Sequence, residues 1–173
     1  MHNQKYLEQL RHIRTPSLYD AMEKFNVRPR TEGLMDTSIR PQLPSLGVMV
    51  GYATTGKIVG ALQPAEGERI ISSRELWQYV QRSSNPSVMV VQDLDQPPAR
   101  SCAWGDVAAS IFLQLGCVGA ITNGGVRDLQ EVEALGFHLF SPAPVVGHAH
   151  TRYIEIDTPV AVGSLVVHPG DLI

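Results

Sequence analysis

The chain of 173 residues has a mass of 18.9 kDa, an apolar fraction of 43% and a charged fraction of 18%. This length and composition are typical of one folded domain and exclude a disordered chain. The net charge of −3 gives no basis for direct binding to nucleic acid or to anionic lipid. The longest apolar stretches fall far short of the roughly 20 residues that span a bilayer, and no secretory signal is visible. We therefore expect a single cytoplasmic domain over residues 1–173.

Two short helices are predicted at the start of the chain. In the first fifteen residues, apolar side chains recur at the spacing that places them on one face of a helix; they are Tyr6, Leu7, Leu10 and Ile13. Thr15-Pro16-Ser17 is typical of a second helix start, and that helix carries an apolar stripe of Leu18, Ala21, Met22 and Phe25. A proline-rich loop over residues 28–46 and one or two strands over residues 47–60 follow.

Short helices and strands alternate through the rest of the chain. We predict helices over residues 72–81, 105–115 and 128–135, and strands over residues 88–94, 118–122 and 137–140. Residues 154–173 are β-rich and show no helical period. Alternation at this close spacing predicts an α/β domain that contains parallel strand pairs.

Two patterns resemble binding motifs without completing them. GYATTGK, residues 51–57, has the G-x-x-x-x-G-K spacing of a phosphate-binding loop, but Ile58 stands where a hydroxyl should bind magnesium and no helix follows. His148 and His150 have the spacing of two metal ligands on a strand, yet no carboxylate or third ligand lies nearby in the sequence, which favours a wet polar loop.

The remaining histidines and the cysteines favour structural roles. His138 and His168 lie singly in apolar strand patterns, which is typical of buried structural histidines. Two cysteines, Cys102 and Cys117, make no disulfide framework, so we expect each of them to pack as a small buried residue.

Two predicted helix starts between residues 99 and 141 carry the residues best suited to chemistry. Asp106 opens the first, and the amides of Val107 and Ala108 fall in its first turn, where unpaired N–H groups can bind a carboxylate or phosphate. TNGGVRD, residues 122–128, follows a strand and opens the second. Arg127 offers a planar fork for a carboxylate or enolate, and Asp128 offers a hard oxygen ligand for Mg²⁺ or Mn²⁺.

A purely structural interpretation of these residues stays open. Asp106 and Asp128 could be helix-capping aspartates, and Arg127 could be an ordinary surface arginine. On the residue types alone, both interpretations stand.

The run GCVGAITNGGVRDLQEVEALGFHLF, residues 116–140, resembles the signature of the RraA-like family. That family includes the class II pyruvate aldolases that act on 4-hydroxy-4-methyl-2-oxoglutarate and 4-carboxy-4-hydroxy-2-oxoadipate. Weaker matches support the resemblance over nearly the whole chain; they are Tyr19-Asp20-Ala21, residues 50–55, Pro159-Val160 and residues 167–171. The resemblance implies a layered α/β/β domain similar to the swivelling phosphohistidine domain, assembled as a homotrimer or a hexamer.

The resemblance also implies roles for individual residues. Asp128 would hold the divalent metal, Mg²⁺ or Mn²⁺, and Asp106 would orient a metal-bound water. Arg127 would contact a 2-oxo acid substrate and stabilise the pyruvate enolate, while the amides of Val107 and Ala108 would hold the pyruvyl carboxylate. The expected activity is cleavage of a 4-hydroxy-2-oxo acid to pyruvate, with oxaloacetate decarboxylation through the same enolate as a side activity. Arg152, His148 and His150 could bind a second carboxylate if they face the same pocket.

Two departures from the family pattern bear on this expectation. His138 replaces the proline of the family's G-F-P-V-F element, a position without a known catalytic role. Family members usually continue past the element that ends here at residues 169–173, so we expect a short C-terminus that lacks an acidic residue lent to a neighbouring subunit. Two alternatives therefore remain: a non-catalytic regulator that binds ribonuclease E, as the family's namesake does, and a related hydro-lyase or sugar-acid enzyme.

Overall fold

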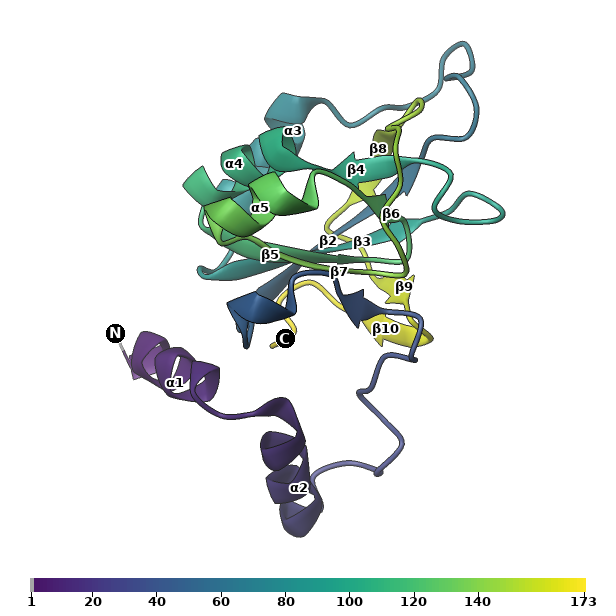
Figure 1. Cartoon of the computed structure of the whole chain (residues 1–173). Coiled ribbons are helices and arrows are strands. Elements are labelled where there is room, and N and C mark those ends of the chain that lie inside the picture. Colours follow the sequence, from purple (N-terminus) through teal and green to yellow (C-terminus); the bar gives the residue numbers. More distant parts are fainter. Residues whose placement is uncertain (1) are drawn as a thin grey trace.

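A six-stranded sheet forms the centre of the computed structural model, which describes residues 2–173 (Figure 1). The strand order is β1-β7-β5-β3-β2-β8. Its four central strands run parallel: β2 (Tyr52–Val59), β3 (Ser87–Asp93), β5 (Cys117–Thr122) and β7 (His138–Ser141). The edge strands β1 (Arg40–Pro41) and β8 (Arg152–Ile156) pair antiparallel with their neighbours. The predicted α/β domain with parallel pairs is confirmed.

Helices and a hairpin cover opposite faces of this sheet. Helices α3 (Ser73–Arg82), α4 (Asp106–Gln114) and α5 (Leu129–Leu135) connect the parallel strands and lie on one face (Figure 1). The antiparallel hairpin of β9 (Val160–Val162) and β10 (Leu165–Val167) lies on the other. The layers are therefore α/β/β, as expected.

Strand β3 shows how the sequence builds both layers of core. Met89 and Val91 pack into the cluster beneath the helices, whereas Val88 and Val90 pack into the cluster beneath the hairpin. All four side chains are fully buried. A strand covered on both faces needs a continuous apolar run rather than an alternating one, which explains the VMVV sequence.

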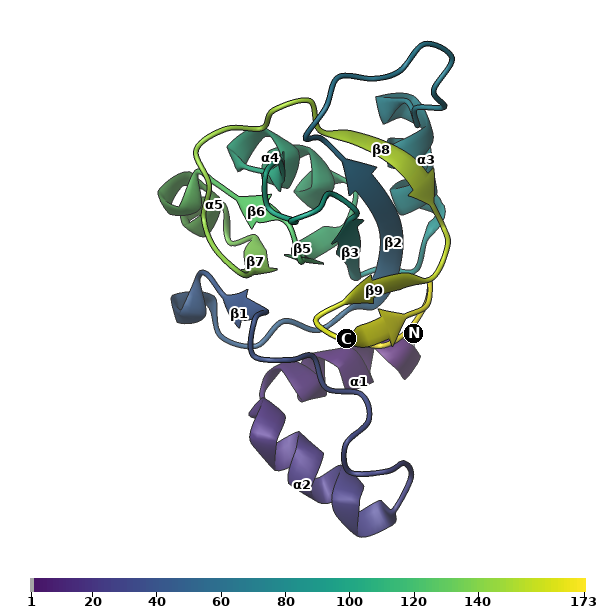
Figure 2. The same cartoon turned by 90° about the vertical axis from the view of Figure 1, so that its right-hand side faces the viewer.

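The two N-terminal helices lie outside the sheet. Helix α1 (His2–Arg11) buries Leu7, whereas α2 (Thr15–Phe25) contains no buried residue and Phe25 is 77% exposed. Figure 2 shows α2 extending away from the body of the molecule. A short 3-10 helix, η1 (Pro44–Leu46), follows β1. Both predicted helices are confirmed, but no residue in the apolar stripe of α2 is fully buried within the described chain.

Most of the structural roles predicted from the sequence are also confirmed. The GYATTGK run leads into and lies within β2, and Lys57 Nζ forms an ion pair of 2.6 Å with Glu155 Oε2. Cys102, Cys117 and His138 are buried. The prediction that His168 is a buried strand histidine is wrong. His168 follows the end of β10 and is exposed, and its Nδ1 lies 3.8 Å from Asp171 Oδ2. Over residues 2–173, no helix combines the length and apolar character that a membrane crossing requires.

Candidate active site

A two-stranded parallel ladder brings the two predicted helix starts together. Strand β4 (Cys102–Trp104) precedes α4, and β6 (Gly125–Val126) precedes α5. The ladder extends by one bond, in which the Arg127 amide donates to the Trp104 carbonyl at 3.0 Å. Because parallel strands end at the same edge, the first residues of α4 and α5 lie side by side. Asp106, Arg127 and Asp128 therefore meet, although 20 residues separate the two motifs.

Asp128 does not cap the helix that it opens. It adopts the left-handed conformation (φ 54°, ψ 42°) and makes no side-chain capping bond to α5. Its Oδ2 instead lies 3.2 Å from Arg127 Nε and accepts a weak hydrogen bond of 3.4 Å from the Asp106 amide at the start of α4. A non-glycine residue in this conformation carries backbone strain. The ordinary capping interpretation of Asp128 is thus not what the structure shows.

The first turn of α4 offers one unpaired amide to a ligand. The Val107 amide donates to Asp106 Oδ1 at 2.7 Å, so the side chain of Asp106 covers it. The Ala109 amide donates to the Gly105 carbonyl at 2.9 Å. Within the described chain, the Ala108 amide has no hydrogen-bond partner. The expectation of two unpaired amides is therefore met only at Ala108.

Gly105 makes room for the carboxylate of Asp128. A Cβ at this position would lie 2.3 Å from Asp128 Oδ2 and 3.2 Å from Arg127 Nε. The sequence analysis singled out Asp106 at this helix start but missed the requirement for a glycine before it. The signal was available in principle, because a glycine immediately before a helix start permits close approach of another group.

The carboxylates fit a divalent cation that is held mainly by water and substrate. Asp128 Oδ1 and Asp106 Oδ2 have no partner within the described chain, while the second oxygen of each accepts an amide hydrogen bond. No group of three potential metal ligands occurs in residues 2–173. Mg²⁺ commonly binds one or two carboxylates and completes its shell with waters and substrate oxygens, so this donor set fits such an ion.

A cavity of about 440 Å³ opens beside these residues. Its lining includes Gly105, Asp106, Val107, Ala108 and Arg127. Both Arg127 and Asp128 are about one-third exposed, which leaves them accessible to a small molecule. The cavity therefore presents the guanidinium and the unpaired amide to the same space.

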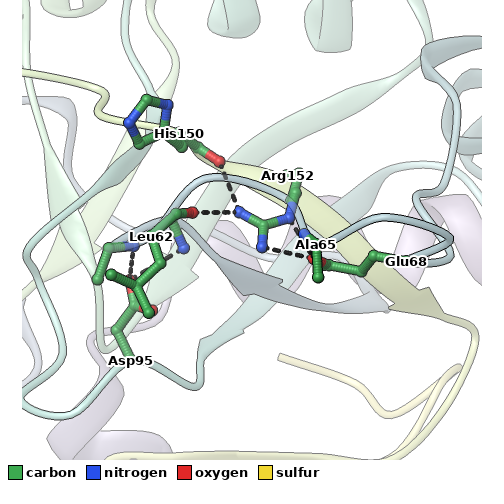
Figure 3. Close-up of polar contacts among 8 residues, drawn as sticks. Leu62, Ala65, Glu68, Asp95, His150 and Arg152 are labelled. Carbon is green, nitrogen blue, oxygen red and sulfur yellow. Dashed lines mark hydrogen bonds and ion pairs between the residues drawn. The ribbon is translucent and has the colours of Figure 1, made fainter.

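The second group of predicted anion-binding residues is only partly assembled. Arg152 and His148 line this cavity together with Arg127, whereas His150 does not. Arg152 is already engaged, because its Nε and Nη2 donate to the two carboxylate oxygens of Glu68 at 2.7 and 2.8 Å (Figure 3). His148 and His150 are exposed in a turn, as the wet-loop interpretation predicts.

A buried carboxylate that sequence reasoning did not single out organises the neighbouring loops. Asp93, at the end of β3, accepts hydrogen bonds of 2.9 Å from the amides of both Asp95 and Ala99. The side chain of Asn123 bonds the Asp93 backbone reciprocally, accepting from its N–H at 2.7 Å and donating to its carbonyl at 2.9 Å. Burial raises the pKa of Asp93 above its usual value. These bonds fix the turn that leads from β5 to Arg127.

Comparison with known proteins assigns this arrangement to a family. A family model described as RraA-like, Aldolase/RraA, matches residues 15–173. The chain belongs to the RraA-like family. The resemblance predicted from the sequence is confirmed, and the arrangement of the layers is that of an RraA-type fold.

Individual members of the RraA-like family differ in the roles that their names state. A Halalkalibacterium halodurans protein, provisionally named 4-hydroxy-4-methyl-2-oxoglutarate aldolase, is 25% identical over 97% of this chain and 71% of its own length. RraAS2 of Streptomyces coelicolor, described as an unusual member of the RNase ES inhibitor RraA family, aligns with a TM-score of 0.70 at 20% identity, covering 96% of this chain and 78% of that one. The RNA-processing inhibitor RraA of Thermus thermophilis aligns with a TM-score of 0.63 at 17% identity, covering 93% of this chain and 86% of that one. At these identities the two solved structures show the shared fold.

Proposed function

We propose that this RraA-like protein is a divalent-metal-dependent lyase that cleaves a 4-hydroxy-2-oxo acid of the 4-hydroxy-4-methyl-2-oxoglutarate type and releases pyruvate. One observation carries the proposal: Asp106 and Arg127 line one cavity beside an unpaired helix amide, and the Asp128 carboxylate contacts both of them, with its Oδ2 3.2 Å from Arg127 Nε and 3.4 Å from the Asp106 amide. A protein that only binds a macromolecular partner has no need of this constellation. The name of the Halalkalibacterium halodurans relative agrees with the proposal.

Each residue contributes a distinct step. The Ala108 amide and the positive end of α4 would bind the substrate carboxylate. Arg127 would donate to the 2-keto oxygen, where negative charge develops as the C3–C4 bond breaks. Asp106 would receive the proton of the C4 hydroxyl, directly or through a water, as C4 becomes a carbonyl. The electron pair of the broken bond moves to the C2–C3 enolate, and protonation at C3 completes pyruvate.

The metal would be Mg²⁺ or Mn²⁺, held by Asp128 with Asp106 nearby. When bound, such an ion supplies Lewis-acid polarisation of the keto group. Arg127 Nε lies 3.2 Å from Asp128 Oδ2, so the guanidinium also holds that carboxylate in place. Oxaloacetate decarboxylation would follow the same course, because loss of its C4 carboxylate leaves the same enolate.

Pyruvate release tests this proposal directly. 4-Hydroxy-4-methyl-2-oxoglutarate and oxaloacetate are each supplied with Mg²⁺ or Mn²⁺, and again with EDTA. We expect release that EDTA abolishes, and that Asp128→Ala lowers at least about 100-fold. Glu131→Ala, an exposed acidic position on α5, is the matched control and should retain activity. Calorimetric titration with Mn²⁺ should show binding by the wild type and its loss in Asp128→Ala.

A regulatory role would give the opposite pattern. Absence of pyruvate release and of Mn²⁺ binding, together with inhibition of ribonuclease E by both wild type and Asp128→Ala, would overturn the lyase proposal. A hydro-lyase would instead bind Mn²⁺ and consume a hydroxy acid without releasing pyruvate.

We further propose a homotrimer or a hexamer as the assembled form. The apolar stripe of α2 has no buried member in the single chain, and Phe25 at its end is 77% exposed. Large exposed apolar patches commonly mark contact surfaces. Sedimentation equilibrium measures the mass directly, and a monomer would contradict this assignment.

A further inference from the structure

The side chain of Asn123 takes the place of a peptide unit at the end of the β3–β5 ladder. The last backbone pair of this ladder is Val91 with Thr122. Beyond it, Asn123 Oδ1 accepts from the Asp93 N–H at 2.7 Å, and Asn123 Nδ2 donates to the Asp93 carbonyl at 2.9 Å. A carboxamide can do this because it carries both a donor and an acceptor, as a peptide unit does. Both backbone groups of Asp93 therefore stay paired, although the main chain of β5 has turned away.

The turn itself, at Gly124 and Gly125, leaves no room for side chains. A Cβ at Gly124 would lie 3.1 Å from Asp93 Oδ2, and a Cβ at Gly125 would lie 2.5 Å from Val145 Cγ2. The Gly124 amide also donates to the buried hydroxyl of Thr122 at 2.9 Å. Each residue of the turn is thus held by a hydrogen bond or by a close contact, and the direction in which the chain enters β6 is fixed.

The same bonds also fix where β4 begins. The carboxylate of Asp93 holds the loop that follows β3 through two amide hydrogen bonds of 2.9 Å. That loop ends at Ser101, a fully buried residue whose carbonyl accepts from the Gly125 amide at 3.3 Å. Strand β4 begins at the next residue, and β6 begins two residues after Asn123. Both strands of the β4–β6 ladder therefore start from one junction, formed by Asn123, Asp93 and Ser101.

The β4–β6 ladder carries the geometry of this junction to the candidate active site. Its last bond joins the Arg127 amide to the Trp104 carbonyl at 3.0 Å. Asp128 follows Arg127 directly, and Asp106 follows Trp104 by two residues. Every bond on this path joins atoms of one chain, so the path is independent of how subunits assemble. A displacement at the junction would move the reacting groups relative to one another, and small displacements of such groups carry large rate costs.

We propose that Asn123 is a positioning residue of this site, and that its carboxamide sets Arg127 and Asp128 in place relative to Asp106. This inference rests on the proposed lyase function, because that reaction is what the positioning serves. In this role Asn123 contacts neither substrate nor metal and acts through the main chain of β6. Loss of the carboxamide leaves the N–H and the carbonyl of Asp93 unpaired, and Asp93 is only 2% exposed. Buried backbone groups need partners, so the end of β3 and the turn must shift to regain them.

Kinetics of Asn123→Ala test the positioning role. We expect kcat for pyruvate release from 4-hydroxy-4-methyl-2-oxoglutarate to fall at least about 10-fold, because Arg127 no longer meets the developing enolate. KM should stay within about threefold, because the Ala108 amide that binds the substrate carboxylate is unchanged. Asn85→Ala, at an exposed asparagine before the other end of β3, is the matched control and should keep both constants. Rates are expressed per folded molecule, with the folded fraction taken from urea denaturation. A kcat equal to that of the wild type on this basis would make Asn123 a structural residue and overturn the inference.

Asn123→Asp tests the donor of the carboxamide separately. An ionised carboxylate can still accept from the Asp93 N–H but offers nothing to the Asp93 carbonyl, whereas a protonated carboxyl group offers both a donor and an acceptor. The ratio of its kcat to that of the wild type should therefore rise as pH falls from about 8 to about 5, while the ratio for Asn123→Ala stays constant. Asp93 and Asp95 titrate in all three proteins, so the ratios remove their common contribution. A ratio for Asn123→Asp that does not change with pH would overturn the inference.

Amide hydrogen exchange, measured by NMR, separates this inference from the function on which it rests. In Asn123→Ala the Arg127 amide should lose protection at least about 10-fold more than the amides in the middle of β5. Absence of pyruvate release by the wild type would overturn the lyase function, and exchange at Arg127 would then decide by itself whether Asn123 holds β6 in place. Unchanged protection of the Arg127 amide would overturn the inference whether or not pyruvate is released.

Discussion

The carboxylate of Asp128 occupies the space that a side chain at Gly105 would need: a Cβ there would lie 2.3 Å from Asp128 Oδ2. Gly105 precedes α4, and Asp128 precedes α5, so the contact joins the starts of two helices. It also fixes where the metal-binding carboxylate of the proposed site points. Substitution of Gly105, which has no side chain to take part in the reaction, should therefore act on the chemistry.

Gly105→Ala should displace Asp128 and reduce pyruvate release at least about 10-fold, because small displacements of catalytic groups carry large rate costs. Overpacking of this kind also lowers the free energy of unfolding by about 1–3 kcal/mol. Gly147→Ala is the control, because a Cβ at Gly147 meets no atom within 4 Å. Measured kcat and urea denaturation report the two effects. Equal activity of the two variants would show that Asp128 tolerates the displacement.

Arg127→Lys should lower kcat about 100-fold, because one preorganised donor at a developing oxyanion contributes an effect of this size. A lysine keeps the positive charge but loses the planar fork that can contact Asp128 and the keto oxygen together. Arg82→Lys, on the exposed side of α3, is the matched control and should leave kcat unchanged. A kcat equal to that of the wild type would remove Arg127 from the reaction.

How far the sequence could predict this molecule depends on whether a feature is local. The strand VMVV and the helix starts at Asp106 and Asp128 follow from apolar runs and helix-start patterns, and all three lie where predicted. The prediction that Asp106 and Asp128 belong to one site came from the family resemblance. The physical cause of their adjacency is the β4–β6 ladder. Strand β6 has two residues and strand β4 has three, which is too few to give a recognisable strand pattern in the sequence.

Features that join distant segments escaped prediction. Glu68 and Arg152 are 84 residues apart, and nothing local to either residue indicates the partner. The coverage of the Val107 amide by Asp106 depends on a side-chain rotamer rather than on residue type. His168 follows an apolar run of valines, but the strand ends before it and its side chain reaches solvent. In each case tertiary geometry decides the outcome.

Phe137→Ala should destabilise the protein by about 3–5 kcal/mol. Phe137 is fully buried and stacks on Trp104, a residue that lines the cavity, with ring centroids 5.5 Å apart. Val146→Ala removes an apolar side chain that is 96% exposed and should change the free energy of unfolding by less than about 0.5 kcal/mol. Urea denaturation of both variants makes the comparison, and similar midpoints would show that this aromatic pair contributes little.

The stability of the fold should fall as pH drops below neutral, because of His138. This side chain is 6% exposed in β7, and burial, assisted by the charge of Arg11, lowers the pKa of its imidazole from the ordinary value of 6.5. The unfolded chain therefore binds a proton at a pH at which the folded chain does not. By linkage, the stability that His138 contributes is complete above about pH 6.5 and is lost as pH falls toward the lowered pKa.

His138→Leu should remove this part of the pH dependence. Urea midpoints measured between pH 8 and pH 5 should decline less steeply in His138→Leu than in the wild type. His150→Gln, at an exposed histidine, should keep the wild-type slope. The comparison rests on slopes because the leucine also changes packing against Gly119, its partner in β5. A slope in His138→Leu equal to that of the wild type would assign the acid sensitivity between pH 8 and pH 5 to other groups.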